Sequence, residues 1–198
     1  PTPAEMPVLV SVQTKDPFLS EAGVSMKPSI DIVCVIDHSG SMEGLNLKLL
    51  KNTLEMLLEF LSEEDRMSIV IFDDKAKRMF PLIRMTPANK NLAAAAINSI
   101  KPDGGTNICK GLEFGLEVLR QRRAKNQVSS ILLLSDGLEE DALPIIKETI
   151  AKIDIKENYT INTFGYGLEH DPIRMSEIAI SKLLFLYQQI TDYFVNKS

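Results

Sequence analysis

The side chains best suited to binding chemistry in this sequence are small, oxygen-bearing and gathered in three short segments. In the first segment Asp37, Ser39 and Ser41 alternate, so their side chains can converge on one point in a turning loop. The second segment, 103–107, contributes Thr106, and the third segment, 135–137, contributes Asp136. Two carboxylates and three hydroxyls form an all-oxygen set, which hard cations such as Mg²⁺ prefer. No cysteine–histidine cluster accompanies them, which disfavours zinc.

The same residue types also form ordinary turns and helix caps. One such loop alone would usually be a turn and nothing more, and Thr106 by itself is best interpreted as a helix N-cap. The set stands out because all three loops fall at one edge of the sheet inferred below. From the residues alone, a metal site and plain turn chemistry both stay open.

Apolar runs alternate with helical patterns along the chain, and this alternation predicts the elements that position the loops. Strands buried on both faces are expected at 30–36, 66–72, 129–134 and 159–165, with a short edge strand at 76–80. Helical spacing of apolar residues predicts helices at 47–61, 89–100, 108–119 and 143–153, and from 172 onward. The fold class is therefore α/β, Rossmann-like and doubly wound, with a mostly parallel central sheet, one short antiparallel edge strand and helices on both faces. Ligand sites in such folds lie at the carboxyl ends of the strands.

Length and composition exclude several classes of function. The 198 residues predict one domain, and the net charge of −5 has the wrong sign for a general nucleic-acid binder. No apolar run reaches the roughly 20 residues of a membrane-spanning helix, so we expect no membrane insertion. Two cysteines cannot form a disulfide framework, which favours a cytoplasmic location. The chain begins at Pro1 without the pattern of a signal peptide, and we expect it to be a piece of a longer polypeptide.

Taken together, three motifs resemble the von Willebrand factor type A domain. They are Asp37-His38-Ser39-Gly40-Ser41-Met42, Gly104-Gly105-Thr106-Asn107 and Leu134-Ser135-Asp136-Gly137, which match the three segments of that family's metal-ion-dependent adhesion site. The resemblance covers about 29–194, so we assign 29–198 to the domain. Residues 1–28 form an N-terminal extension in which 8–14 is a candidate for a further edge strand. Together with 163–167, the first motif is most similar to intracellular and microbial members, including plant proteins that carry a separate ubiquitin-ligase domain.

This resemblance implies a non-enzymatic, divalent-metal-dependent protein-interaction module within a larger multidomain protein. By the same resemblance, Ser39, Ser41 and Thr106 ligate Mg²⁺ through their hydroxyls, while Asp37 and Asp136 bind it directly or through water. Oxygen ligands also accept Mn²⁺ or Ca²⁺. One coordination position then stays open for an Asp or Glu carboxylate of a partner protein. The isolated domain is expected to be a monomer.

Two other functions compete with this interpretation. The first is a Mg²⁺-dependent phosphohydrolase in which Asp37, Asp73 and Asp136 face one metal ion. Against it, no aspartate follows Asp37 by two residues to act as general acid, and no loop offers an obvious lysine to hold phosphate. The second is a folded scaffold whose metal site is unused.

Four further features complete the expectations. His38 is interpreted as a residue at the rim of the metal loop, and Asp73 with Asp74 as a hairpin turn. The glycine that usually precedes the family's last strand is absent, yet we expect 184–188 to be that strand and a helix to start at Asp192. A basic group is interpreted as the end of a helix, where cations oppose the helix dipole, with a phosphate- or partner-binding patch as the alternative: Arg120, Arg122, Arg123 and Lys125.

Overall fold

The computed structural model describes residues 28–136, 142–153, 155, 158–167 and 170–182. The strands are β1 (Ile30–Asp37), β2 (Arg66–Phe72), β3 (Ala76–Arg84), β4 (Val128–Ser135) and β5 (Thr160–Gly165). The helices are the 3-10 turn η1 (Gly40–Met42), α1 (Leu45–Phe60), α2 (Pro87–Ser99), α3 (Ile108–Arg120) and α4 (Ala142–Ile153), and 172–182 are also helical. The strands expected at 8–14 and 184–188 and the helix expected from residue 192 lie outside the described residues.

The five strands form one sheet in the order β3-β2-β1-β4-β5. Every neighbouring pair is parallel except β2 and β3, which are antiparallel. This confirms the predicted fold class of a doubly wound, mostly parallel sheet. The chain moves outward from β1 through β2 to β3 and then returns to β4 on the other side of β1. The carboxyl ends of β1 and β4 therefore flank the switch point at which such folds bind ligands.

The edge strand β3 is longer than the sequence predicted. We expected a short strand ending at Phe80, but it continues through Pro81 to Arg84. A proline is tolerated there because an edge strand has one side without a hydrogen-bonding neighbour. The pairing with β2 shifts register on either side of Ile69, which accommodates the irregularity.

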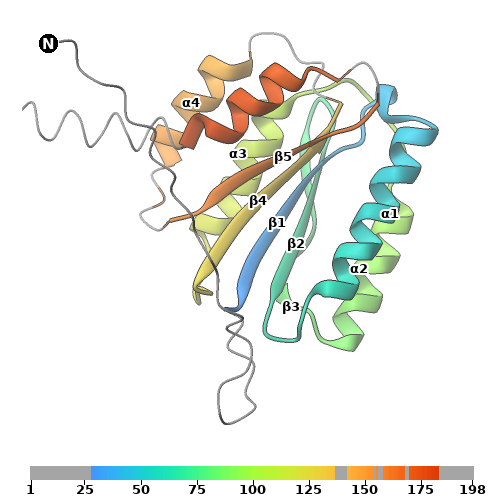
Figure 1. Ribbon diagram of the computed structural model, residues 1–198, viewed down its shortest axis with the longest axis vertical. Coiled ribbons are helices and arrows are strands. Elements are labelled where there is room, and N and C mark those ends of the chain that lie inside the picture. The colour runs from blue at the N-terminus through green and yellow to red at the C-terminus, as the bar shows by residue number, and fades with distance from the viewer. Residues whose placement is uncertain (1–27, 137–141, 154, 156–157, 168–169, 183–198) are drawn as a thin grey trace, which may run out of the picture.

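Two helical layers cover the sheet, as Figure 1 shows, with α1 and α2 on one face and α3, α4 and the helical residues 172–182 on the other. Each layer buries its own apolar core. The first core packs α1 and α2 against side chains such as Cys34 and Ile69, and the second packs α3 and α4 against side chains such as Val33 and Val35. Because β1 is buried on both faces, its carboxyl end is held firmly from both sides.

Glycines in α3 let this helix approach the sheet closely. A Cβ at Gly111 would fall 2.5 Å from Cδ1 of Phe72, and one at Gly115 would fall 2.5 Å from Cγ2 of Val35. Only a residue without a side chain fits such contacts. Since α3 begins directly after the second oxygen-rich segment, this packing also fixes where that segment lies. Among the described helices, none has both the length and the apolarity needed to cross a membrane.

Candidate metal centre

The first of the three segments turns sharply at the end of β1 and is organised around Asp37. This carboxylate is fully buried. Its Oδ1 accepts a hydrogen bond from the Ser39 N–H at 2.9 Å, and its Oδ2 accepts one from the Ser135 hydroxyl at 2.6 Å. The hydroxyl oxygens of Ser39 and Ser41 lie 3.1 Å apart. The alternating spacing therefore does bring oxygen atoms of the first segment to one point, as predicted.

The third segment places a second carboxylate, Asp136, directly after β4. Its side chain is buried, and its Oδ1 accepts no hydrogen bond from any described residue. Burial raises the pKa of Asp37, and the negative charge of Asp136 adds to that rise, while hydrogen bonds from Ser135 and Ser39 oppose it. A buried carboxylate oxygen that lacks a donor, next to a second carboxylate, is costly unless a cation compensates for it.

The second segment is joined to the first by two backbone hydrogen bonds. The Gly40 N–H donates to the Gly104 carbonyl at 3.1 Å, and the Asp103 N–H donates to the His38 carbonyl at 2.8 Å. Gly104 has a φ of +64°, and a Cβ at this position would fall 3.0 Å from the Cβ of Asp73. Glycine is therefore required for the segment to turn this close to β2.

Thr106 does not cap α3, which corrects the simplest interpretation of this residue. The cap is Asn107, whose side-chain oxygen accepts a hydrogen bond from the Lys110 N–H at 2.9 Å. Asn is an equally good capping residue, and it stands directly before the first helical residue. The Thr106 side chain is half-buried, and its hydroxyl makes no hydrogen bond to a described residue.

His38 is buried rather than at the rim, so that expectation was wrong. Its Nδ1 lies 3.0 Å from the carbonyl oxygen of Lys101, and its Nε2 lies 3.5 Å from Oδ2 of Asp73. The ring thus connects the first segment to Lys101, just before the second segment, and to the turn after β2. That turn is as predicted, because Asp73 accepts a hydrogen bond from the Lys75 N–H at 2.6 Å. Asp74 also supports the second segment through the Gly105 N–H at 3.0 Å.

Ser135 was not among the site residues predicted from the sequence. Its hydroxyl joins the ends of β1 and β4 through Asp37, and it is fully buried. The available signal was its position, directly before Asp136 at the end of a strand that pairs with β1. Gly137, which follows in the same motif, lies outside the described residues.

The donors suit a hard cation. Oxygen is the only element they offer, and one buried carboxylate oxygen has no hydrogen-bond donor among the described residues. Within the same part of the chain, no group of three or more histidine, cysteine, aspartate or glutamate side chains is arranged to hold a metal. A metal bound by the described residues would therefore depend on serine and threonine hydroxyls as well as on carboxylates.

The chain belongs to the von Willebrand factor type A domain family, whose model matches residues 31–193. Two relatives from Arabidopsis thaliana are similar to it over most of its length. The E3 ubiquitin-protein ligase WAV3 is 30% identical over 80% of this chain and 21% of its own. The probable E3 ubiquitin-protein ligase WAVH2 is 35% identical over 90% of this chain and 25% of its own. The chain thus spans a quarter or less of the length of these relatives.

A solved structure supports the fold independently. The von Willebrand factor type A protein from Catenulispora acidiphila superimposes with a TM-score of 0.67, at 19% identity, over 80% of this chain and 37% of that one. At this identity the likeness concerns the fold alone. The family is thereby established by the sequence model, and the architecture by the superposition.

Proposed function

We propose that this domain is a non-enzymatic protein-interaction module that binds a divalent cation and, through it, an acidic side chain of a partner protein. The residues that would hold the ion are Asp37, Ser39, Ser41, Thr106 and Asp136. Mg²⁺ is the proposed ion, and Mn²⁺ or Ca²⁺ would be accepted by the same oxygen ligands.

The observation that carries the proposal is the buried Asp136 carboxylate. One of its oxygens has no donor among the described residues, and its charge acts on the buried Asp37. Two buried carboxylates lie at the switch point of the sheet, beside two hydroxyls whose oxygens are 3.1 Å apart. Their buried negative charge destabilises the fold without a cation and would be compensated by a bound one.

The partner chemistry follows from the neutral ligands. Three of the five proposed ligands are hydroxyls, so the bound ion would keep much of its positive charge and attract one more carboxylate. The surroundings are negative, since Glu43, Asp74 and Asp103 are exposed on the adjoining loops. Such a rim repels a broadly acidic surface. The proposed partner therefore offers a single Asp or Glu flanked by neutral or basic residues.

The relatives support a role inside a larger protein. WAV3 and WAVH2 are named as ubiquitin-protein ligases, and this chain matches only a quarter or less of each. In a protein of that kind the domain would recognise a partner while another part carries any catalytic activity. We place the protein in the cytoplasm, where its few cysteines need no disulfide, and propose that the isolated domain is a monomer.

The phosphohydrolase alternative loses one of its proposed carboxylates. The Asp73 carboxylate accepts a hydrogen bond from the Lys75 N–H at 2.6 Å and lies 3.5 Å from His38, so its side chain contacts the turn and the first segment. Without Asp73, a phosphohydrolase site would have only two carboxylates, Asp37 and Asp136, and no residue to act as general acid.

The proposal is tested with the 198-residue chain and a short peptide that carries one aspartate between neutral residues. After chelator treatment, amide chemical shifts are followed as Mg²⁺ and then the peptide are added. We expect the peptide to bind only after the metal, with shifts centred on Gly40 and Gly104. The matched peptide with asparagine in place of aspartate should not bind. Equal binding in EDTA, or hydrolysis of a generic phosphate ester with Mg²⁺, would overturn the proposal.

A further inference from the structure

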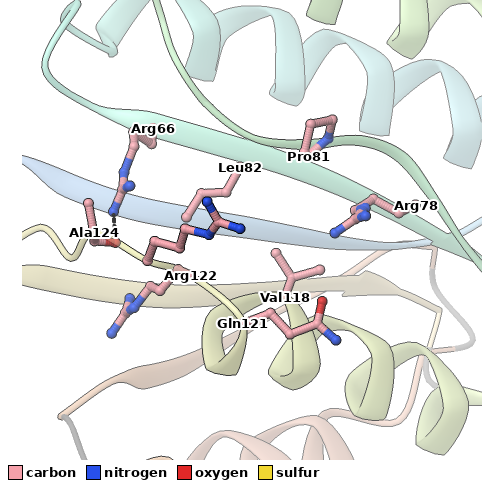
Figure 2. Close-up of a pocket in the computed structure, with 9 residues that line it drawn as sticks. Arg66, Arg78, Pro81, Leu82, Val118, Gln121, Arg122 and Ala124 are labelled. Atoms are coloured by element: carbon pink, nitrogen blue, oxygen red, sulfur yellow. Dashed lines mark hydrogen bonds between the residues drawn. The ribbon is translucent and has the colours of Figure 1, made fainter.

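A cavity of about 350 Å³ lies on the α3 face of the sheet, between the edge strand β3 and the end of α3. Figure 2 shows how its walls are built. Arg66 and Arg78 come from β2 and β3, and Gln121 and Arg122 follow on from α3. Four of its nine lining residues are arginines, the fourth being Arg123, and none is acidic. Cavities that bind small organic ligands have volumes in this range.

Two of the arginines are held in place by one buried carboxylate. Asp31, on β1, is fully buried and accepts hydrogen bonds from Nε and Nη2 of Arg66, both at 2.7 Å. Arg122 approaches the same carboxylate at 3.0 Å and has a side chain only 2% exposed. Arg66 also donates to the Ala124 carbonyl at 2.7 Å. Guanidinium groups fixed in this way keep a defined direction, as an anion site requires.

This arrangement corrects the expectation for the basic group after α3. Arg120 alone behaves as the sequence suggested, since it pairs with Glu117 in the last turn of the helix. Arg122 turns inward and joins β1 to β4 through Asp31 and the Ser129 hydroxyl. The alternative of a phosphate- or partner-binding patch therefore becomes the better interpretation of these residues.

The other two arginines of the cavity are exposed and not engaged. The side chains of Arg78 and Arg123 make no hydrogen bond or ion pair within the described part of the chain. Four guanidinium groups against the single Asp31 carboxylate leave three positive charges around one cavity. The carbonyl end of α3 offsets part of this charge. Such an excess is unexpected in a chain whose net charge is −5.

We infer that this cavity binds a phosphate monoester. A phosphate monoester carries close to two negative charges at neutral pH and accepts paired hydrogen bonds from arginine. Beside the arginines, Pro81, Leu82 and Val118 provide an apolar wall, which suits the organic part of the ester. The ester is either a phosphorylated side chain of a polypeptide or a small phosphorylated molecule, and the chemistry of recognition is the same for both.

This site is separate from the candidate metal centre. Arg66 is the first residue of β2 and Asp31 the second of β1, so both lie at the amino-terminal edge of these parallel strands. The oxygen-rich segments follow the carboxyl-terminal ends of β1 and β4. Phosphate binding here would therefore not depend on a metal, and the inference does not rest on the proposed function.

The test uses phenyl phosphate and a peptide containing one phosphotyrosine, each titrated into the full chain in EDTA so that no metal-bound phosphate contributes. Binding is followed by calorimetry and by the arginine Nε–H resonances. The variant is Arg78→Ala with Arg123→Ala, because these exposed side chains make no hydrogen bond or ion pair with the described residues. The matched control is Lys77→Ala with Arg84→Ala, which removes the same charge from β3 outside the cavity.

We expect saturable binding of both probes, weakened about tenfold or more by the cavity variant, which corresponds to about 1.4 kcal/mol. The control variant should stay within about twofold of the unmodified chain, because screened surface charges contribute little. A tighter peptide supports a polypeptide ligand, and equal affinities support a small molecule. Absence of saturable binding for both probes, or equal losses in the two variants, would overturn the inference.

Discussion

Asp136→Ala should be at least as stable as the unmodified chain without metal, and less stable than the unmodified chain once Mg²⁺ is added. Without metal, Asp136 has a buried oxygen that lacks a donor among the described residues, and its charge opposes that of Asp37. An unsatisfied buried acceptor costs about 1–3 kcal/mol. Asp136→Ala removes that cost and the repulsion, while it loses only a small side chain in a loop. We therefore expect the free energy of unfolding in EDTA to hold or to rise by about 1 kcal/mol.

With Mg²⁺ the unmodified chain should become the more stable of the two. A ligand present at about 100 times its dissociation constant stabilises the native state by about 2.7 kcal/mol, whereas a variant that cannot bind gains nothing. For a chain of this size, 1 kcal/mol moves the midpoint of thermal unfolding by about 2–4 °C. The two melting curves should thus exchange order when Mg²⁺ replaces EDTA.

The matched control is Asp103→Ala, which removes an exposed carboxylate from the neighbouring second segment. Its backbone N–H still donates to His38, so the loop keeps its hydrogen bond. This variant should be stabilised by Mg²⁺ as much as the unmodified chain. Equal stabilisation of Asp136→Ala by Mg²⁺ would show that Asp136 is not a metal ligand. A variant much less stable than the unmodified chain in EDTA would show that the buried carboxylate carries no cost in the metal-free protein.

Three further predictions concern buried groups in the rest of the fold. Arg66→Ala should lower the free energy of unfolding by about 2–3 kcal/mol in urea titrations, because it leaves a buried carboxylate with one guanidinium fewer. Arg84→Ala at an exposed pair should change it by less than about 0.5 kcal/mol, and similar losses would contradict the buried network. Gly115→Ala should destabilise by about 1–3 kcal/mol, since its Cβ would fall 2.5 Å from Val35; a stabilised variant would disprove this close packing. Burial raises the pKa of Cys34 to about 12, so its thiol should resist iodoacetamide at pH 8 in the native protein and react with it in urea. Because the thiol of the unfolded chain ionises at a lower pH than the buried thiol, the free energy of unfolding should also fall as the pH rises above about 9.

Most of the architecture could be predicted because its signals are local. Continuous apolar runs such as 30–36 and 66–72 predict strands buried on both faces, and the structure confirms both. The ends of edge strands were harder to predict, because they depend on which strands lie beside them in the sheet. The sequence ends β3 at Phe80, whereas the structure carries it past Pro81, since only the position of a strand within the sheet decides whether a proline is tolerated.

In the candidate metal centre, too, local features could be predicted and contacts between distant residues could not. Alternation in Asp37-x-Ser39-x-Ser41 is a local pattern, so the convergence of its oxygens was predictable. The roles of His38 and Ser135 were not, because both act across the sheet on residues far away in the sequence. Arg122 is similar: its partner Asp31 is 91 residues away, and no spacing rule joins them.

Crystals grown with Mn²⁺ in place of Mg²⁺ would show whether the three oxygen-rich segments hold a metal ion, because anomalous scattering locates the ion without any assumption about function. We expect one dominant peak within coordination distance of the Ser39 and Ser41 hydroxyls, with Asp37 and Asp136 beside it. Asp136→Ala crystals prepared in the same way should lose that peak. Absence of the peak in the unmodified protein, or a dominant peak at Asp73 and Asp74 instead, would show that these segments are not the metal site.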